Sequence, residues 1–322
     1  MKHPVVLKQC ESYEEDTVCQ AVKTLLEGLE AENRVNRGER ILLKPNLLAA
    51  DPLSSGTCPH PIVVYAIAKW LKERGAKLLL SDSAGFGSAR GAARTSGIME
   101  VTDRLGIPVV EMRETIRKER DFSPSQMPRF FTMAKLLDEV DGVVNLPKLK
   151  AHSQLLLSIS VKNLYGLVPG KRKAWRHLVH GKNVETFSDM LVTHAHLVGP
   201  KIRFTVLDAI DAMEGKGPRG GAVRRVGVLA AGQDPFSLDA VVCDMIGINP
   251  MNLPTVASSV RAGFLDADMS QIPLLGDELD MLRVKDFKLP KHLIPVNFSP
   301  LRILQSTYRH LRVLFQQWTS ES

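Results

Sequence analysis

Short runs of apolar, β-branched residues alternate with stretches of helical periodicity, and this alternation is the feature that most restricts the possible folds. Residues 5–7, 41–43 and 141–145 have the composition of buried strands. Residues 14–29 and 61–74 repeat apolar side chains at the spacing of one helix face. Strands and helices in this order predict an α/β fold, with a mixed or mainly parallel sheet flanked by helices.

The length and composition are those of a globular protein. At 322 residues and 44% hydrophobic content, the chain is long enough to form a substantial core. No uninterrupted apolar run reaches the ~20 residues of a membrane span, and the first residues do not form a secretory signal. We therefore expect a cytoplasmic protein that is not integral to a membrane. Residues 1–265 are expected to form an α/β domain of one or two lobes, followed by a loop-rich tail over 266–322.

The positive charge is concentrated in one segment. The chain has 42 basic and 35 acidic residues, and residues 142–184 contain six Lys, two Arg and no Asp or Glu. That segment therefore carries +8, and the rest, with 34 basic and 35 acidic residues, is almost neutral. A segregated excess of charge favours an anion-binding site, and a solvated basic face is the alternative.

Several polar motifs follow directly after predicted strands. Lys44 and Asn46 follow one strand, Asp82 follows the next, and Thr57 precedes a predicted helix. Because parallel α/β sheets bind ligands at the carboxyl ends of their strands, we expect these side chains to line one site. The alternative is structural: proline and asparagine also end strands in turns, and Thr57 can cap a helix.

The basic segment contains the chemically most suggestive side chains. Lys148, Lys150 and Lys162 follow predicted strands, with Asn163 adjacent to the last of them. Lysines gathered at one edge would bind phosphate or carboxylate and would lower one another's pKa, so that one could act as a base or nucleophile. His152 would serve as a proton shuttle there, although a purely structural histidine is an equal alternative.

Acidic residues after later strands complete the predicted site. Asp208 and Glu214 could orient a lysine or hold a divalent cation. A glycine-rich loop at 81–91, followed about 20 residues later by Glu111, approaches a dinucleotide-binding pattern, but its spacing is one residue too long.

Taken together, the motif order resembles a known family. The motifs are Lys44-Pro45-Asn46, Thr57-x-Pro59, Asp82-Ser83-x-Gly85, Asn145-Leu146-Pro147-Lys148-x-Lys150-x-His152, Ser160-Val161-Lys162-Asn163-x-x-Gly166, Asp208-x-x-x-x-Met213-Glu214-Gly215-x-Gly217-Pro218 and Asp234-Pro235-x-x-x-Asp239-Ala240. Over residues 1–265 they are similar to the DUF 362 family, whose members are uncharacterised and often described as iron–sulfur centre proteins. The resemblance implies the fold and the site location, but no reaction.

The cysteines set this chain apart from many relatives in that family. Its four cysteines, Cys10, Cys19, Cys58 and Cys243, lie far apart, and the clustered cysteines of a ferredoxin-like region are missing. No iron–sulfur cluster is therefore expected from this chain alone, and a redox role would need a separate electron carrier. The cofactor stays open, with a divalent cation as one option.

The C-terminal residues predict an amphipathic helix over 300–318. Ser299-Pro300 is a good helix start, and Leu301, Leu304, Tyr308, Leu311, Phe315 and Trp318 recur at helical spacing. Such a helix could dock on the body, pair with a second copy of the chain, or lie on an anionic membrane.

The leading interpretation is an enzyme-like protein that binds a small phosphorylated or carboxylated metabolite. The predicted catalytic residues are Lys162, His152 and Asp82. The predicted substrate-binding residues are Lys44, Asn46, Thr57, Lys148, Lys150, Asn163 and Glu214, and Asp208 and Glu214 are the candidate metal ligands. One alternative is a nucleic-acid-binding protein using residues 142–184, against which the 6% aromatic content argues. The other is a redox partner of a separate iron–sulfur protein.

Overall fold

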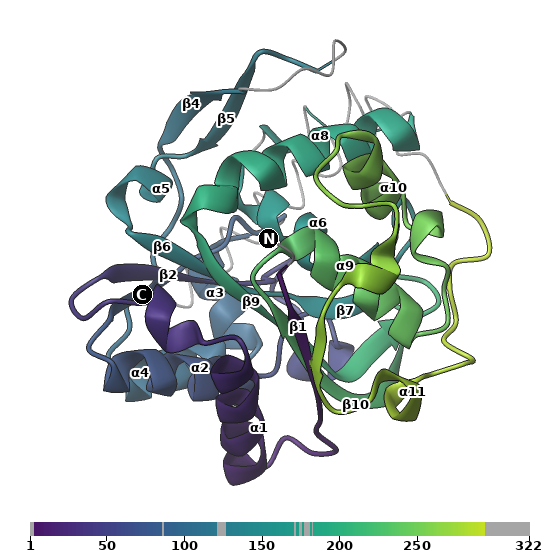
Figure 1. Ribbon diagram of the computed structural model, residues 1–322. Helices are drawn as coiled ribbons and strands as arrows, with labels where there is room; N and C mark the ends of the chain where they lie inside the picture. Colours follow the sequence, from purple (N-terminus) through teal and green to yellow (C-terminus); the bar gives the residue numbers. More distant parts are fainter. Residues whose placement is uncertain are drawn as a thin grey trace.

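A central sheet with helices on both faces forms the body of the protein (Figure 1). The computed structural model describes residues 3–85, 87–120, 127–170, 172–173, 176, 181 and 183–293. Its main path of strands runs in the order β11-β1-β10-β9-β6-β2-β3. The strands are β1 (Val5–Gln9), β2 (Arg40–Pro45), β3 (Lys77–Leu80), β6 (Gly142–Leu146), β9 (Ile202–Glu214), β10 (Ala222–Gly232) and β11 (Leu274–Gly276).

The sheet is mixed and mainly parallel, as the sequence predicted. Strands β3, β2, β6 and β9 run parallel to one another, while β10 is antiparallel to both β9 and β1. Two further strands extend the sheet from the end of β6: β7 (Lys148–His152) pairs in parallel with β9, and β8 (Leu156–Ser158) pairs antiparallel with β7. Strand β7 begins two residues after the carboxyl end of β6, and the carboxyl end of β2 pairs with that end of β6, so the three lie close together.

Each face of the sheet is covered by its own group of helices (Figure 1). The side chains of β2 alternate between the two cores, because Ile41 and Leu43 join one buried cluster and Leu42 joins the other. One face carries α1 (Glu15–Gly28), α2 (Pro61–Glu73), α3 (Ala89–Thr95) and α4 (Ile98–Arg104), and the other carries α6 (Ser160–Leu164), α8 (Val184–Val198), α9 (Pro235–Met245) and α10 (Pro254–Arg261).

Several predicted elements differ from the observed ones. The helix expected over 91–105 is divided into α3 and α4 at Gly97, whose φ of 79° is a left-handed conformation that glycine adopts readily. The strand expected over 107–111 is reduced to one bridge between Leu80 and Val109. The polar segment 112–128 contributes β4 (Thr115–Glu119), which pairs with β5 (Phe130–Ala134) outside the main sheet.

The described part of the predicted tail is joined to the body. Strand β11 pairs in parallel with β1, and α11 (Leu279–Leu282) follows it. The predicted helix over 300–318 lies outside the described residues, and the boundary at 265 stays a prediction. In the described part of the chain, no helix combines the length and apolarity needed to cross a membrane.

The remaining short helices are α5 (Leu136–Glu139), η1 (Ala31–Arg34), η2 (Leu53–Ser55), η3 (Tyr165–Leu167), η4 (Gly199–Lys201), η5 (Pro250–Asn252) and η6 (Met269–Gln271).

Candidate functional site

The carboxyl ends of β2 and β6 bring the predicted motifs to one edge of the sheet. Lys44 of β2 lies in register with Asn145 of β6. The side-chain amide of Asn163, from α6, donates to the backbone oxygen of Lys44 at 3.2 Å and to Oδ1 of Asn145 at 2.8 Å. These bonds tie α6 to the ends of both strands. We refer to Lys44, Lys148, Lys150, Lys162 and Lys173 as the lysine cluster.

Lys44 forms the buried base of the cluster. Its Nζ donates to Oδ1 of Asp82 at 2.9 Å, to Oδ1 of Asn163 at 3.2 Å and to the backbone oxygen of Pro45 at 3.0 Å. The other oxygen of Asp82 accepts from the backbone N–H of Leu47 at 2.7 Å. Burial lowers the pKa of Lys44, and the Asp82 carboxylate opposes this shift. All three N–H groups of Lys44 are therefore used inside the protein.

Lys148 is also held by internal partners. Its Nζ donates to Oδ2 of Asp208 and to the hydroxyl of Tyr13, both at 2.8 Å. The Asp208 carboxylate accepts three further bonds, from the Tyr13 hydroxyl and from the backbone N–H groups of His60 and Ile210. A carboxylate has about four acceptor positions, so the protein's own donors occupy Asp208. In this arrangement Asp208 orients a lysine.

Lys150 is buried without an ion pair to a carboxylate in the described residues. Its Nζ donates to Oδ1 of Asn46 at 2.8 Å and to the backbone oxygen of Thr57 at 2.7 Å. The Thr57 hydroxyl lies instead 2.9 Å from the hydroxyl of Ser55. Burial lowers the pKa of Lys150 to about 8. Asn46 and Thr57 thus contact the cluster through Lys150.

Lys162 and Lys173 are half-buried. The Lys162 Nζ lies 5.1 Å from the centre of the Tyr165 ring, and no described residue forms an ion pair or hydrogen bond with it. Burial lowers the pKa of Lys162 to about 7, and the ammonium groups of Lys173, Lys150 and Lys44 add to this shift. Lys173, whose pKa burial lowers to about 8, donates to the backbone oxygen of Ser83.

The first turn of α6 is held by a buried carboxylate that the sequence analysis had not assigned to the site. Asp239 of α9 accepts the backbone N–H groups of Ser160 at 2.8 Å and Val161 at 3.3 Å. Burial raises the pKa of Asp239 to about 7. Lys173 was missed as well, because only its place in a basic run marked it. The contacts of Asp239 with Ser160 and of Lys173 with Ser83 each join segments that are far apart in the sequence.

A glycine in η3, the short helix that follows α6, permits the close packing of the Lys44–Asp82 pair. A Cβ atom at Gly166 would overlap the Asp82 carboxylate and the Lys44 ammonium group. The backbone there can approach the ion pair only because this position has no side chain. The Asn163-x-x-Gly166 spacing is thereby explained: the asparagine bonds the end of β2, and the glycine covers the ion pair.

The two remaining predicted residues have other surroundings. Nδ1 of His152, whose side chain is buried, accepts from the backbone N–H groups of Gln154 at 3.1 Å and Leu155 at 3.3 Å. The Glu214 carboxylate accepts from the backbone N–H of Lys288 at 3.1 Å and lies 3.5 Å from a guanidinium nitrogen of Arg224. In the described part of the chain, none of these contacts links Glu214 to the lysine cluster.

The glycine-rich loop is not a free phosphate site. The carboxylate of Glu111 accepts the backbone N–H groups of Ala89 at 3.1 Å and Arg90 at 3.0 Å, at the start of α3. In dinucleotide-binding folds a phosphate binds at the equivalent helix start. The protein's own carboxylate occupies that position here. In the described ranges, no three His, Cys, Asp or Glu side chains are grouped so that they could hold a metal ion.

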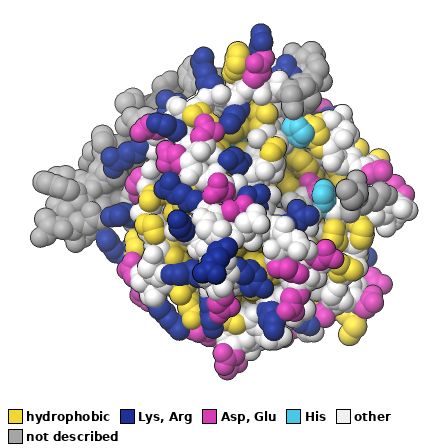
Figure 2. Space-filling view, turned by 60° about the vertical axis from the view of Figure 1, so that its left-hand side comes forward, with side chains coloured by type: hydrophobic (Ala, Val, Ile, Leu, Met, Phe, Trp, Pro, Cys, Tyr) yellow, Lys and Arg dark blue, Asp and Glu magenta, His cyan; other side chains and the backbone are white. Residues whose placement is uncertain are grey.

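Two lysines of the basic segment lie in the interior of the protein. Lys148 is 2% exposed and Lys150 is 1% exposed. The face seen in Figure 2 carries Lys and Arg side chains interspersed with Asp and Glu. Among the described residues of the segment, at least these two charges are directed inward, toward the edge of the sheet.

Comparison with known proteins places these residues in a wider group. The model of the family DUF362, a domain of unknown function, matches residues 41–244, which include the lysine cluster. A relative named thylakoid-associated protein, from Synechocystis sp., is 39% identical over 316 residues, or 98% of this chain and 96% of the relative.

Two solved structures are similar over part of the fold. A protein from Thermotoga maritima has a TM-score of 0.44 and 12% identity over 71% of this chain. The lactate racemase apoprotein from Thermoanaerobacterium thermosaccharolyticum has a TM-score of 0.48 and 14% identity over 75% of this chain. The chain spans 57% of the length of each of these two proteins.

Proposed function

We propose that this chain, which belongs to the family DUF362, binds a small phosphorylated or carboxylated metabolite at the lysine cluster and acts on it as an enzyme. The observation that carries the proposal is the position of Lys162. Its half-buried ammonium group has no acceptor among the described residues, and the charges acting on it come from three ammonium groups and one carboxylate, Asp82. A bound anion would supply the missing counter-charge.

The cluster separates into supporting and available lysines. Lys44 is paired with Asp82 and also bonds Asn163, and Lys148 is paired with Asp208, so both lysines have internal partners. Lys162 lacks such a pair, and its pKa of about 7 leaves a large neutral fraction near neutral pH. A neutral lysine amine can act as a base or a nucleophile. His152 remains the proposed proton shuttle. For Asp82, which the sequence predicted to be catalytic, we propose the orientation of Lys44 instead, because both of its oxygens accept internal hydrogen bonds.

Burial of the cluster argues against the nucleic-acid alternative. Binding to a phosphate backbone needs lysines on the surface, but Lys148 and Lys150 are buried and held by side chains or backbone of the protein itself. A small anion that enters the edge of the sheet fits this geometry better. The cellular location stays a proposal: the sequence favours the cytoplasm, and the Synechocystis relative is named as thylakoid-associated.

Competitive amine labelling tests the proposal. Trace acetylation across a range of pH, followed by peptide mass spectrometry, gives the reactivity of each lysine in the folded full-length chain. We expect Lys162 to react with a midpoint near its pKa of about 7, and inorganic phosphate or citrate to slow its labelling. Lys135, an exposed residue paired with Glu114, is the control that anions should not protect.

Two results would contradict the proposal. One is labelling of Lys162 that neither anion slows, and the other is equal protection of Lys162 and Lys135. Native mass spectrometry of the freshly purified protein then identifies a co-purifying ligand. The Lys162→Met variant should lose that ligand, whereas Lys135→Met should retain it.

A further inference from the structure

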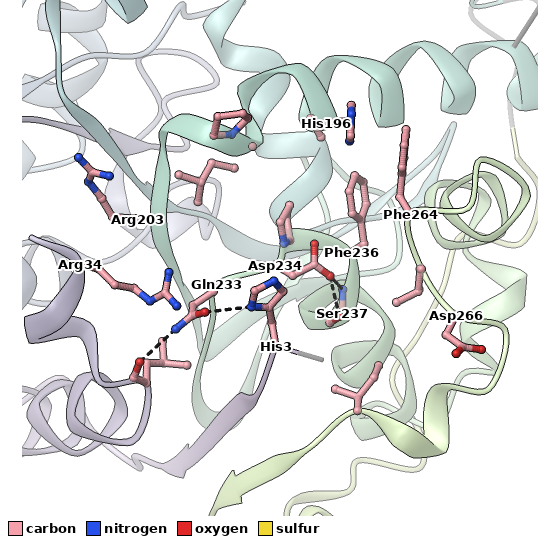
Figure 3. Close-up of a pocket in the computed structure, with 18 of the residues that line it drawn as sticks. His3, Arg34, His196, Arg203, Gln233, Asp234, Phe236, Ser237, Phe264 and Asp266 are labelled. Carbon is pink, nitrogen blue, oxygen red and sulfur yellow. Dashed lines mark hydrogen bonds between the residues drawn. The ribbon is translucent and has the colours of Figure 1, made fainter. Parts of the chain in front are cut away.

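A cavity lies at the edge of the sheet opposite the lysine cluster. It has a volume of about 960 Å³ and is located where β9 begins and β10 ends (Figure 3). Lys148 and Lys150 pair with residues farther along β9, Asp208 and Met213. Its size falls within the usual range of small-molecule sites, roughly 300–1,000 Å³. We propose that this cavity binds a small organic molecule that carries an anionic group and a planar aromatic ring.

Arg34 provides the position for the anionic group. Arg34 is half-buried in the wall of the cavity, and no described residue forms an ion pair or a hydrogen bond with its guanidinium, although the nearby Glu30 attracts it. The neighbouring Arg203 is already engaged, because it donates to Glu39 at 2.9 Å and to the backbone oxygen of Asp141 at 3.0 Å. An anionic oxygen beside Arg34 would satisfy its donors and offset the repulsion between the two arginines.

The cavity is polarised from one side to the other. Figure 3 shows Arg34 and Arg203 on one side and Asp266 on the opposite side. Between them, Gln233 is fixed by bonds to Nδ1 of His3 at 3.0 Å and to the backbone oxygen of Leu29 at 3.1 Å. Asp266 disfavours an anionic group on its own side, while on the other side the two arginine charges outnumber the single carboxylate of Glu30.

The side of the cavity away from the arginines is aromatic. The ring of Phe264 stacks on His196 with 4.0 Å between centroids and lies 5.7 Å from Phe236. The carboxylate of Asp234 nearby is engaged in capping α9, where it accepts from the N–H and hydroxyl of Ser237 at 2.7 and 2.6 Å. A planar ring placed against these aromatic side chains would add to an existing stack.

Fluorescence titration with anilinonaphthalene sulfonate, an anionic aromatic probe, tests the proposal on the full-length chain. We expect saturable binding that Arg34→Gln weakens about tenfold or more, because the variant loses a charged hydrogen-bond donor to the anionic group. Arg37→Gln is the matched control: it removes the same charge from an exposed residue that does not line the cavity. Circular dichroism confirms that both variants are folded.

Competition identifies the anionic group. Displacement of the probe by phenyl phosphate, by phenylacetate or by both would show whether phosphate or carboxylate is preferred, and the uncharged benzyl alcohol should displace nothing. The proposal fails if Arg34→Gln and Arg37→Gln bind the probe equally, or if neither anion displaces it. It also fails if Lys162→Met, and not Arg34→Gln, abolishes binding, because the probe would then occupy the lysine cluster.

Discussion

Nζ of Lys44 lies 2.9 Å from Oδ1 of Asp82, and the two side chains are only 0% and 6% exposed. The pair joins the ends of the neighbouring strands β2 and β3 beneath the backbone of Gly166. Because both charges are removed from water, each depends on the other for compensation. This relationship makes the Lys44–Asp82 pair a structural element of the site.

Removing one partner of this pair should be costly. Lys44→Met leaves the Asp82 carboxylate buried and uncompensated, and we expect a loss of about 3–5 kcal/mol in the free energy of unfolding, measured with urea at neutral pH. Lys135→Met, which breaks the exposed pair with Glu114, should change stability little. The double variant Lys44→Met/Asp82→Leu should recover part of the loss. If Lys44→Met and Lys135→Met were equally stable, this role of Lys44 would be contradicted.

The close approach at Gly166 gives a second prediction. Gly166→Ala places a Cβ atom on the Lys44 ammonium and the Asp82 carboxylate, so the turn after α6 must shift. We expect a melting temperature several degrees lower, because adding a methyl group to a packed site usually costs ~1–3 kcal/mol of stability. Gly199→Ala is the control, because a Cβ there meets no atom within 4 Å and its φ of −41° suits any residue. Similar melting temperatures for the two variants would exclude the predicted clash.

The location of the site could be predicted from the sequence because it depends on strand ends. Lys44 and Asp82 follow apolar runs that form β2 and β3, and Lys148 follows the run that forms β6. Parallel strands bring such residues to one edge whatever their exact contacts are. The count of charged residues further predicted that this edge carries positive charge, and the structure has buried lysines there.

The pairing of these residues could not be predicted. Residue types do not reveal that Asp208 pairs with Lys148, sixty positions away, while Glu214 contacts Lys288 and Arg224 instead. Successive side chains of a strand point to opposite faces of the sheet, so an error of one residue in the predicted pairing changes which residues are in contact. The short strand β11 was also missed, because its pairing with β1 depends on tertiary structure.

A buried histidine predicts a specific response to acid. Nε2 of His194 lies 3.1 Å from the backbone oxygen of Leu164, Nδ1 has no hydrogen-bond partner in the described part of the chain, and burial lowers the pKa of His194 to about 3. Between that value and the unfolded value near ~6.5, only the unfolded chain binds the proton, so stability falls as the pH falls.

His194→Gln keeps a donor for the Leu164 oxygen but does not titrate. In that pH window we expect the free energy of unfolding of the variant to fall less steeply than that of the wild type, by about 1.4 kcal/mol per pH unit. Urea denaturation at several pH values measures both slopes. Parallel curves would mean that His194 binds a proton as readily in the folded protein as in the unfolded chain.

Lys162 should reduce the stability of the protein at neutral pH. Burial and neighbouring ammonium groups lower its pKa to about 7, whereas a lysine in an unfolded chain titrates near ~10.4. Between these values the unfolded chain holds more protons than the folded protein, so the contribution of this residue to stability rises with pH. Lys162→Met should therefore be more stable than the wild type near pH 7, and the difference should disappear toward about pH 10.

Urea denaturation of both proteins across this pH range measures the difference, and Lys135→Met serves as the exposed control that should show no gain in stability. Inorganic phosphate adds a second test, because an anion bound at the lysine cluster would stabilise the charged form of Lys162 in the folded state. Phosphate should then raise the stability of the wild type and of Lys135→Met, but not that of Lys162→Met. A Lys162→Met variant less stable than the wild type at neutral pH would mean that this ammonium group has an internal partner, and the anion site would lose its central residue.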